Sequence, residues 1–160
     1  MKPIQRVSNV LASARRQRGL AMVEFTIGAP VLLLLLLAIG EFGRLLSNYN
    51  QLLQSSRDAA RYVASQAMNA TLGRVELSTG LQGTAKSLVV YGAPSQGARS
   101  ALLPQLTTDM VQVSQVNDEH IQVSVTYTFR PLIGTGLPGF FGNGIPMNIP
   151  LTATTVMRAL

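Results

Sequence analysis

Hydrophobic side chains dominate one stretch near the start of the chain. Over residues 20–40 the sequence reads LAMVEFTIGAPVLLLLLLAIG, and its only charged side chain is Glu24. A helix of these 21 residues extends about 31 Å at ~1.5 Å per residue, which matches the ~30 Å hydrocarbon layer of a bilayer. We therefore predict one transmembrane helix over residues 20–40.

The following stretch, residues 41–70, has the periodicity of an amphipathic helix. Apolar residues recur there at intervals of three and four, and the charged residues Arg57, Asp58 and Arg61 fall on the remaining, solvated face. The apolar positions are Phe42, Leu45, Leu46, Tyr49, Leu52, Leu53, Ala60, Val63 and Ala67. We expect this helix to continue the membrane helix and to end near Met68.

Residues 71–160 are predicted to form a β-rich domain. The clearest strand is 121–129, where apolar and polar residues alternate and predict one buried and one wet face. Shorter strands are expected at 86–91, 111–116 and 147–157, with a loop at 92–104, a turn at Asn117 and Asp118, and Pro150 at a sheet edge. The predicted fold class is α+β, with a long N-terminal membrane-spanning helix packed on a small antiparallel sheet of three to five strands.

Charge and composition narrow the functional classes. Residues 1–18 carry five Lys or Arg and no acid, whereas the rest of the chain carries eight basic and seven acidic residues. A basic tail before an apolar run is a topology signal that keeps the N-terminus cytoplasmic. Nucleic-acid binding is not expected, because the basic residues are not spread over a folded surface. With no Cys and only His120, disulfide scaffolds, cysteine nucleophiles and His-rich metal sites are excluded.

Two simpler interpretations of the N-terminal segment are weighed against this one. A cleaved secretory signal has a shorter apolar run and a small-residue cleavage site, which is missing here. An uncleaved signal anchor explains the tail and the Leu run, but it does not explain Glu24. Gly28, Ala29 and Pro30 in the middle of the run either allow close helix packing or reflect neutral drift.

The order of motifs over residues 15–65 resembles a known family. Residues 15–25 read RRQRGLAMVEF, residues 41–44 read EFGR, and residues 50–61 read NQLLQSSRDAAR. In this order they resemble the TadE-like minor pseudopilins of the tight-adherence (Tad/Flp) pilus system, within the type IV pilin superfamily. The resemblance does not separate the TadE-like from the TadF-like class.

The resemblance implies roles for particular residues. A prepilin peptidase would remove residues 1–19 by cutting between Gly19 and Leu20. Glu24, followed by Phe25, would then pair with the new α-amino group of a neighbouring subunit and set the axial register. The alternative for Glu24 is a side chain that reaches back to the membrane surface.

The far end of the membrane helix carries Glu41, Phe42 and Arg44. Glu41 and Arg44 stand three residues apart and can pair on one helix face. We interpret them chiefly as an interfacial stop where the helix leaves the membrane.

An apolar loop is predicted at residues 131–146, where five Gly and three Pro disfavour regular structure. Phe140 and Phe141 within it either form a docking surface or fold back to cap the core.

The sequence thus predicts a minor pseudopilin that acts in assembly, priming or tip structure of a Tad/Flp pilus. Expected partners are the inner membrane, the prepilin peptidase, other pilin and minor pseudopilin subunits, and the pilus assembly platform. The chain would cross the inner membrane once, with an extracytoplasmic C-terminal domain that also reaches the extracellular pilus. No enzyme activity, cofactor or metal is expected. The rivals are a type II secretion pseudopilin and a bitopic envelope protein whose β domain binds a partner.

Overall fold

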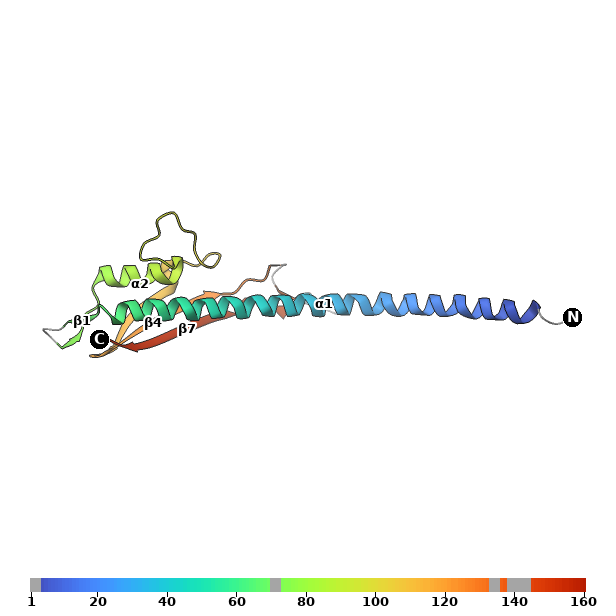
Figure 1. The fold of residues 1–160 in the computed structure, drawn as a ribbon, viewed down its shortest axis with the longest axis horizontal. Helices are drawn as coiled ribbons and strands as arrows, with labels where there is room; N and C mark the ends of the chain where they lie inside the picture. The colour runs from blue at the N-terminus through green and yellow to red at the C-terminus, as the bar shows by residue number, and fades with distance from the viewer. Residues whose placement is uncertain (1–3, 70–72, 133–135, 138–144) are drawn as a thin grey trace.

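The protein has an α+β fold in which one very long helix carries a small globular domain (Figure 1). The structure, a computed structural model, describes residues 4–69, 73–132, 136–137 and 145–160, and for residues 4–19, 136–137 and 145 it describes the backbone alone. The helices are α1 (Ile4–Ala64), α2 (Thr79–Tyr91) and the short 3-10 helix η1 (Thr108–Met110). The strands are β1 (Met68–Asn69), β2 (Arg74–Val75), β3 (Val111–Asn117), β4 (His120–Thr128), β5 (Gly136–Leu137), β6 (Ile145–Pro146) and β7 (Pro150–Arg158).

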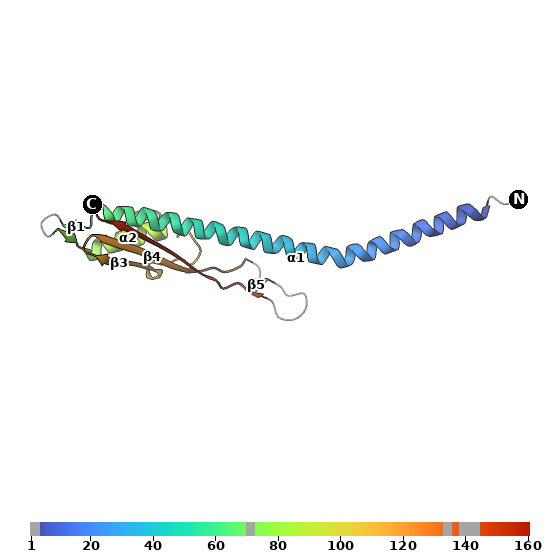
Figure 2. The same ribbon diagram turned by 90° about the horizontal axis from the view of Figure 1, so that it is seen from below.

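Helix α1 is continuous over 61 residues, or about 92 Å at ~1.5 Å per residue. Figure 2 shows a bend in its light-blue part, the region of the colour scale that includes Pro30, the proline inside the helix. Proline lacks the backbone donor for one helical hydrogen bond and clashes with the preceding turn, so a local bend is expected there. The predicted continuation of the membrane helix into the domain is confirmed.

The helix ends at Ala64, four residues before the expected Met68. Its last turn is tightened, because the Gln66 and Ala67 amides both donate to the Val63 carbonyl, at 3.0 and 2.8 Å. Met68 then pairs with Val75 in the two-stranded ladder of β1 and β2. The ladder takes up backbone groups that a longer helix would have used, and this explains the earlier end.

A three-stranded antiparallel sheet in the order β3-β4-β7 forms the second layer. In β4 the side chains of Ile121, Val123, Val125 and Tyr127 are buried, while the residues between them are more exposed, as the alternation predicts. Pro150 opens the edge strand β7 opposite Thr128, where its missing donor is tolerated. The predicted strands at 111–116 and 121–129 are confirmed, and the strand expected at 147–157 is found as β7 at Pro150–Arg158.

Helices α1 and α2 pack beside each other and contact the sheet, with α1 against β4 and β7 and α2 against β3. The core between the layers contains Leu52, Ala59, Ala60 and Val63 of α1, Val89 and Val90 of α2, and the buried face of β4. One polar link crosses it, a hydrogen bond of 2.9 Å between the hydroxyls of Ser56 and Thr155. The N-terminal, apolar half of α1 projects away from this domain (Figure 1).

The strand predicted at residues 86–91 is wrong, because these residues form the end of α2. Ser78 caps the helix by accepting from the Leu81 amide, and Gly92 ends it in the left-handed conformation at φ 65°. Ala85 and Val89, four residues apart, are both buried, which is helical rather than alternating spacing. The loop expected at 92–104 lies outside helices and strands, as predicted.

Candidate functional site

The apolar half of α1 has no cover from the rest of the described chain. Its most apolar window is not buried at all, and it is the one described helix long and apolar enough to cross a membrane. Leu20 and Phe25 are each 72% exposed. Exposing so much contiguous apolar surface to water is strongly unfavourable, so lipid or other chains must cover it. This segment is compatible with a single-pass membrane anchor.

The residues expected to act in processing and assembly lie along this uncovered segment. Gly19 has a helical backbone inside α1, so a peptidase that binds its substrate as an extended strand would have to unwind α1 locally. Glu24 is exposed and has no ion-pair partner within the described part of the chain. The structure brings neither residue together with the globular domain, and both roles stay predictions.

Glu41 and Arg44 join the helix to the end of the sheet. The Glu41 side chain is 5% exposed, and its Oε1 accepts a hydrogen bond of 2.9 Å from the Leu132 amide. Its Oε2 lies 3.4 Å from Nε of Arg44, which confirms the expected pair. Arg44 Nη2 in turn donates to the Arg130 carbonyl at 2.7 Å, and its guanidinium lies 5.3 Å from the centre of the Phe129 ring. The pair therefore holds the segment after β4 against α1, a contact that an interfacial stop does not require.

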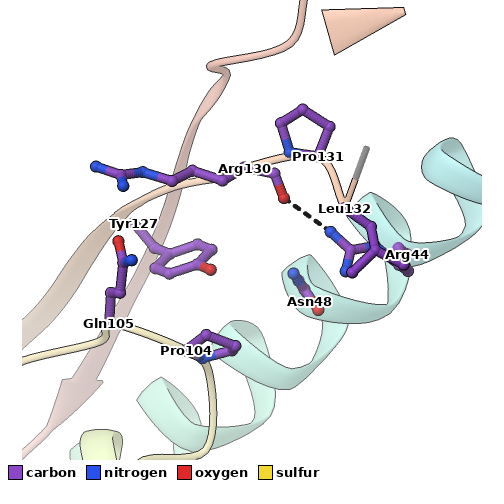
Figure 3. A pocket seen from close by; sticks show the side chains of 8 residues that line it. All are labelled: Arg44, Asn48, Pro104, Gln105, Tyr127, Arg130, Pro131 and Leu132. Atoms are coloured by element: carbon purple, nitrogen blue, oxygen red, sulfur yellow. Dashed lines mark hydrogen bonds between the residues drawn. The ribbon is translucent and has the colours of Figure 1, made fainter. Parts of the chain in front are cut away.

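A pocket of about 250 Å³ opens beside this junction (Figure 3). Figure 3 shows the Tyr127 hydroxyl turned toward Asn48 and Arg44, whereas the Arg130 side chain runs along the opposite side toward Gln105. Tyr127 is only 5% exposed, and within the described ranges its hydroxyl has no hydrogen-bond partner. The pocket is lined by Arg44, Asn48, Pro104, Gln105, Tyr127, Arg130, Pro131 and Leu132.

The floor of the pocket includes a strained turn. The Leu106 amide donates to the Leu103 carbonyl at 3.2 Å, and Gln105 has φ 63°, the one positive φ among the described non-glycine residues. With Pro104 and Gln105 as its central residues, the turn has the features of type II, whose third position normally needs Gly or Asn. A glutamine in this conformation costs about 1–2 kcal/mol.

Sequence reasoning missed this pocket. Tyr127 was expected only as a core residue of its strand, and nothing marked Asn48 or Gln105. The lining comes from three segments far apart in the chain, so no local spacing could have revealed it. The one available signal was the pair Arg130 and Pro131 at the point where the alternation of β4 stops.

Phe140 and Phe141, the candidate docking loop, lie outside the described residues. His120 begins β4, and its Nδ1 lies 2.9 Å from Oδ1 of Asn117 in the turn before it. Over the described ranges, no three His, Cys, Asp or Glu side chains are grouped to hold a metal ion.

Comparison with known proteins gives one match. Residues 19–61 match the family model described as TadE-like protein. The match begins at Gly19, covers the apolar segment and extends into the part of α1 that packs on the domain. No curated protein and no solved structure matches the chain significantly. The match supports a TadE-like protein of the Tad pilus system.

Proposed function

From the TadE-like segment at residues 19–61, we propose that the protein is a minor pseudopilin of a Tad-type pilus, inserted in the inner membrane by α1. The observation that carries the proposal is the uncovered apolar segment with one acid near its start. The role is structural rather than catalytic. The domain would stand on the extracytoplasmic side, because the basic tail favours a cytoplasmic N-terminus.

In this proposal, cleavage between Gly19 and Leu20 creates a charged amine about 6 Å along the helix axis from Glu24, from four residues at ~1.5 Å each. Among the described side chains, which begin at Leu20, no cation pairs with Glu24. An acid at this depth is disfavoured in lipid but is stabilised by a cation. The α-amino group of a neighbouring subunit supplies that cation and fixes the axial register of the two helices.

The proposal is tested by co-expression with a prepilin peptidase and its pilus assembly genes. Wild-type protein should lose the mass of residues 1–19, and Gly19→Glu should block this loss. Glu24→Ala should be cleaved almost normally but should no longer crosslink to other pilin subunits. The matched control is Glu76→Ala, which removes an exposed acid from the globular domain and should change neither result.

The outcomes separate the rival interpretations. An uncleaved chain in piliated cells would contradict the pseudopilin proposal and favour a bitopic envelope protein. A Glu24→Ala chain that is not cleaved would assign Glu24 to peptidase recognition instead of assembly. Crosslinking to subunits of a type II secretion pseudopilus, and to no Tad subunit, would favour that system.

A further inference from the structure

We propose that the pocket beside Arg44 binds the phosphate of an anionic phospholipid headgroup in the leaflet that the domain faces. The inference rests on the membrane placement of α1 proposed above. It goes beyond the pilus role, because it assigns a lipid ligand to the junction between helix and domain.

The first support is the chemistry of the lining. The Tyr127 hydroxyl, the Asn48 amide and the Arg44 guanidinium offer donors on one side of the pocket, and Arg130 adds an exposed cation on the other (Figure 3). None of the described residues that line the pocket is an acid. Glu41 balances the charge of Arg44 from behind, so Arg130 leaves an excess positive charge. Clustered donors with a guanidinium are the usual surroundings of a bound phosphate.

The second support is the hydroxyl of a buried tyrosine. Tyr127 is more than nine-tenths buried, yet its hydroxyl faces the pocket and has no partner in the described part of the chain. The ring is enclosed by protein, but the hydroxyl itself is accessible from the pocket, where it is free to bond a molecule that enters. A ligand oxygen in the pocket would supply that partner.

The third support is position along the helix. Arg44 follows Gly40, the end of the apolar run, by four residues, or about 6 Å at ~1.5 Å each. The headgroup layer occupies about 5–8 Å on each side of the hydrocarbon, given ~40–45 Å for the whole bilayer and ~30 Å for its core. The Arg44 end of the pocket therefore lies at headgroup depth when residues 20–40 span the membrane, and Asn48, about 12 Å past Gly40, marks its outer end.

Exposed apolar residues at the same level indicate a lipid ligand rather than a free anion. Leu132, on the pocket wall, is 74% exposed, and Phe42 of α1, two residues past Gly40, is 56% exposed. In water these side chains would have no cover. At a bilayer surface they meet the upper parts of the acyl chains while the cations stay among the phosphates.

The test is native mass spectrometry on the full chain, released from detergent after incubation with phosphatidylglycerol or phosphatidylcholine. Wild-type protein should bind phosphatidylglycerol more tightly than phosphatidylcholine. Tyr127→Phe and Arg130→Gln should each weaken phosphatidylglycerol binding by roughly tenfold or more, since each removes a hydrogen bond to a charged group. Arg61→Gln, which removes an exposed arginine of α1 about 26 Å farther along the helix, should bind as wild type does.

Controls separate folding, insertion and ligand source. Tyr127→Phe should melt at the wild-type temperature without lipid, because the lost hydroxyl has no protein partner. Resistance of the chain to alkaline extraction from membranes reports insertion independently of the pocket. An inserted chain that binds both lipids equally, or whose two variants bind like wild type, would overturn the inference and leave the pilus proposal standing. Competition by inorganic phosphate at the affinity of phosphatidylglycerol would overturn the lipid assignment in favour of a free anion.

Discussion

Single polar residues decide how the domain is attached to the helix. Glu41 is one of three buried polar residues in the described ranges; the others are Ser55 and Ser56. Both serines donate to carbonyls of their own helix, those of Leu52 and Leu53, and Ser56 also bonds the Thr155 hydroxyl of β7. The Glu41 Oε1 accepts from the Leu132 amide after β4, while its Oε2 lies 3.4 Å from Nε of Arg44 on the same helix, without a hydrogen bond. The buried carboxylate is tolerated because one oxygen accepts a hydrogen bond and the other faces a cation.

Glu41→Ala should therefore loosen the junction. It removes the acceptor of the Leu132 amide and leaves the Arg44 guanidinium without its counter-ion. Because Arg44 is 41% exposed, water compensates in part, and we expect a loss of about 1–3 kcal/mol in the free energy of unfolding. Chemical denaturation of the detergent-solubilised chain measures it.

A second ion pair provides the control. Glu119 lies 3.1 Å from Arg158, but both side chains are more than half exposed. Glu119→Ala should cost only about 0–1 kcal/mol. Equal losses for the two variants would contradict the structural role of Glu41.

At the scale of elements, α2 is defined by its ends more than by its apolar pattern. Its interior includes Gly80 and Gly83, which are poor helix residues, and its length is only 13 residues. The Ser78 cap, the Gly92 stop and the packing of Val89 and Val90 on the core offset these disadvantages.

Two glycine substitutions, one within α2 and one just after it, should change the stability of the domain in opposite directions. Gly83 lies inside the helix, and a methyl group added to it would meet open space, so Gly83→Ala should stabilise the domain by about 0.5–1 kcal/mol. Gly92 has φ 65°, where a side chain is strained, so Gly92→Ala should destabilise it by about 1–2 kcal/mol. Thermal melts of both variants, in the same detergent, check the signs. A stabilising Gly92→Ala would contradict the left-handed end of α2.

The elements differ in how well the sequence predicts them. The long helix and β4 follow from sustained patterns, a largely apolar segment of 21 residues in one case and strict alternation in the other. Residues 86–91 carry a short apolar run that suits a strand or a buried helix equally, and the caps at Ser78 and Gly92 that define α2 are seen only in the structure. The pocket could not be predicted, because Asn48, Gln105 and Tyr127 meet only after the sheet has packed on α1.

The whole molecule depends on close packing between α1 and the domain. Ala59 and Ala60 are fully buried on α1, and their small side chains let the helix approach the elements packed on it. The contact is long-range, since β7 follows α1 by more than 80 residues and the Leu160 amide returns to the Ala64 carbonyl at 3.0 Å. The C-terminal end of the chain therefore packs back on the end of α1.

Ala60→Leu should push α1 away from the elements packed on it and destabilise the domain. Three extra carbon atoms at a fully buried position force shifts that cost about 1–3 kcal/mol. Gln54→Leu, at an exposed position of the same helix, should change the free energy of unfolding by no more than about 0.5 kcal/mol. Denaturation midpoints of the two variants test the contrast, and a harmless Ala60→Leu would show that the interface is looser than the structure has it.

The unbroken course of α1 past Gly40 also gives the protein an angular register. Each residue of an α-helix turns the chain by about 100° around the axis. The number of residues between Glu24 and Glu41 therefore fixes the angle about the helix axis between the Glu24 side chain and the domain. Inserting one residue between them would leave both ends of the helix intact but rotate the domain by about 100° relative to Glu24. The length of this segment thus sets which way the domain faces around the helix.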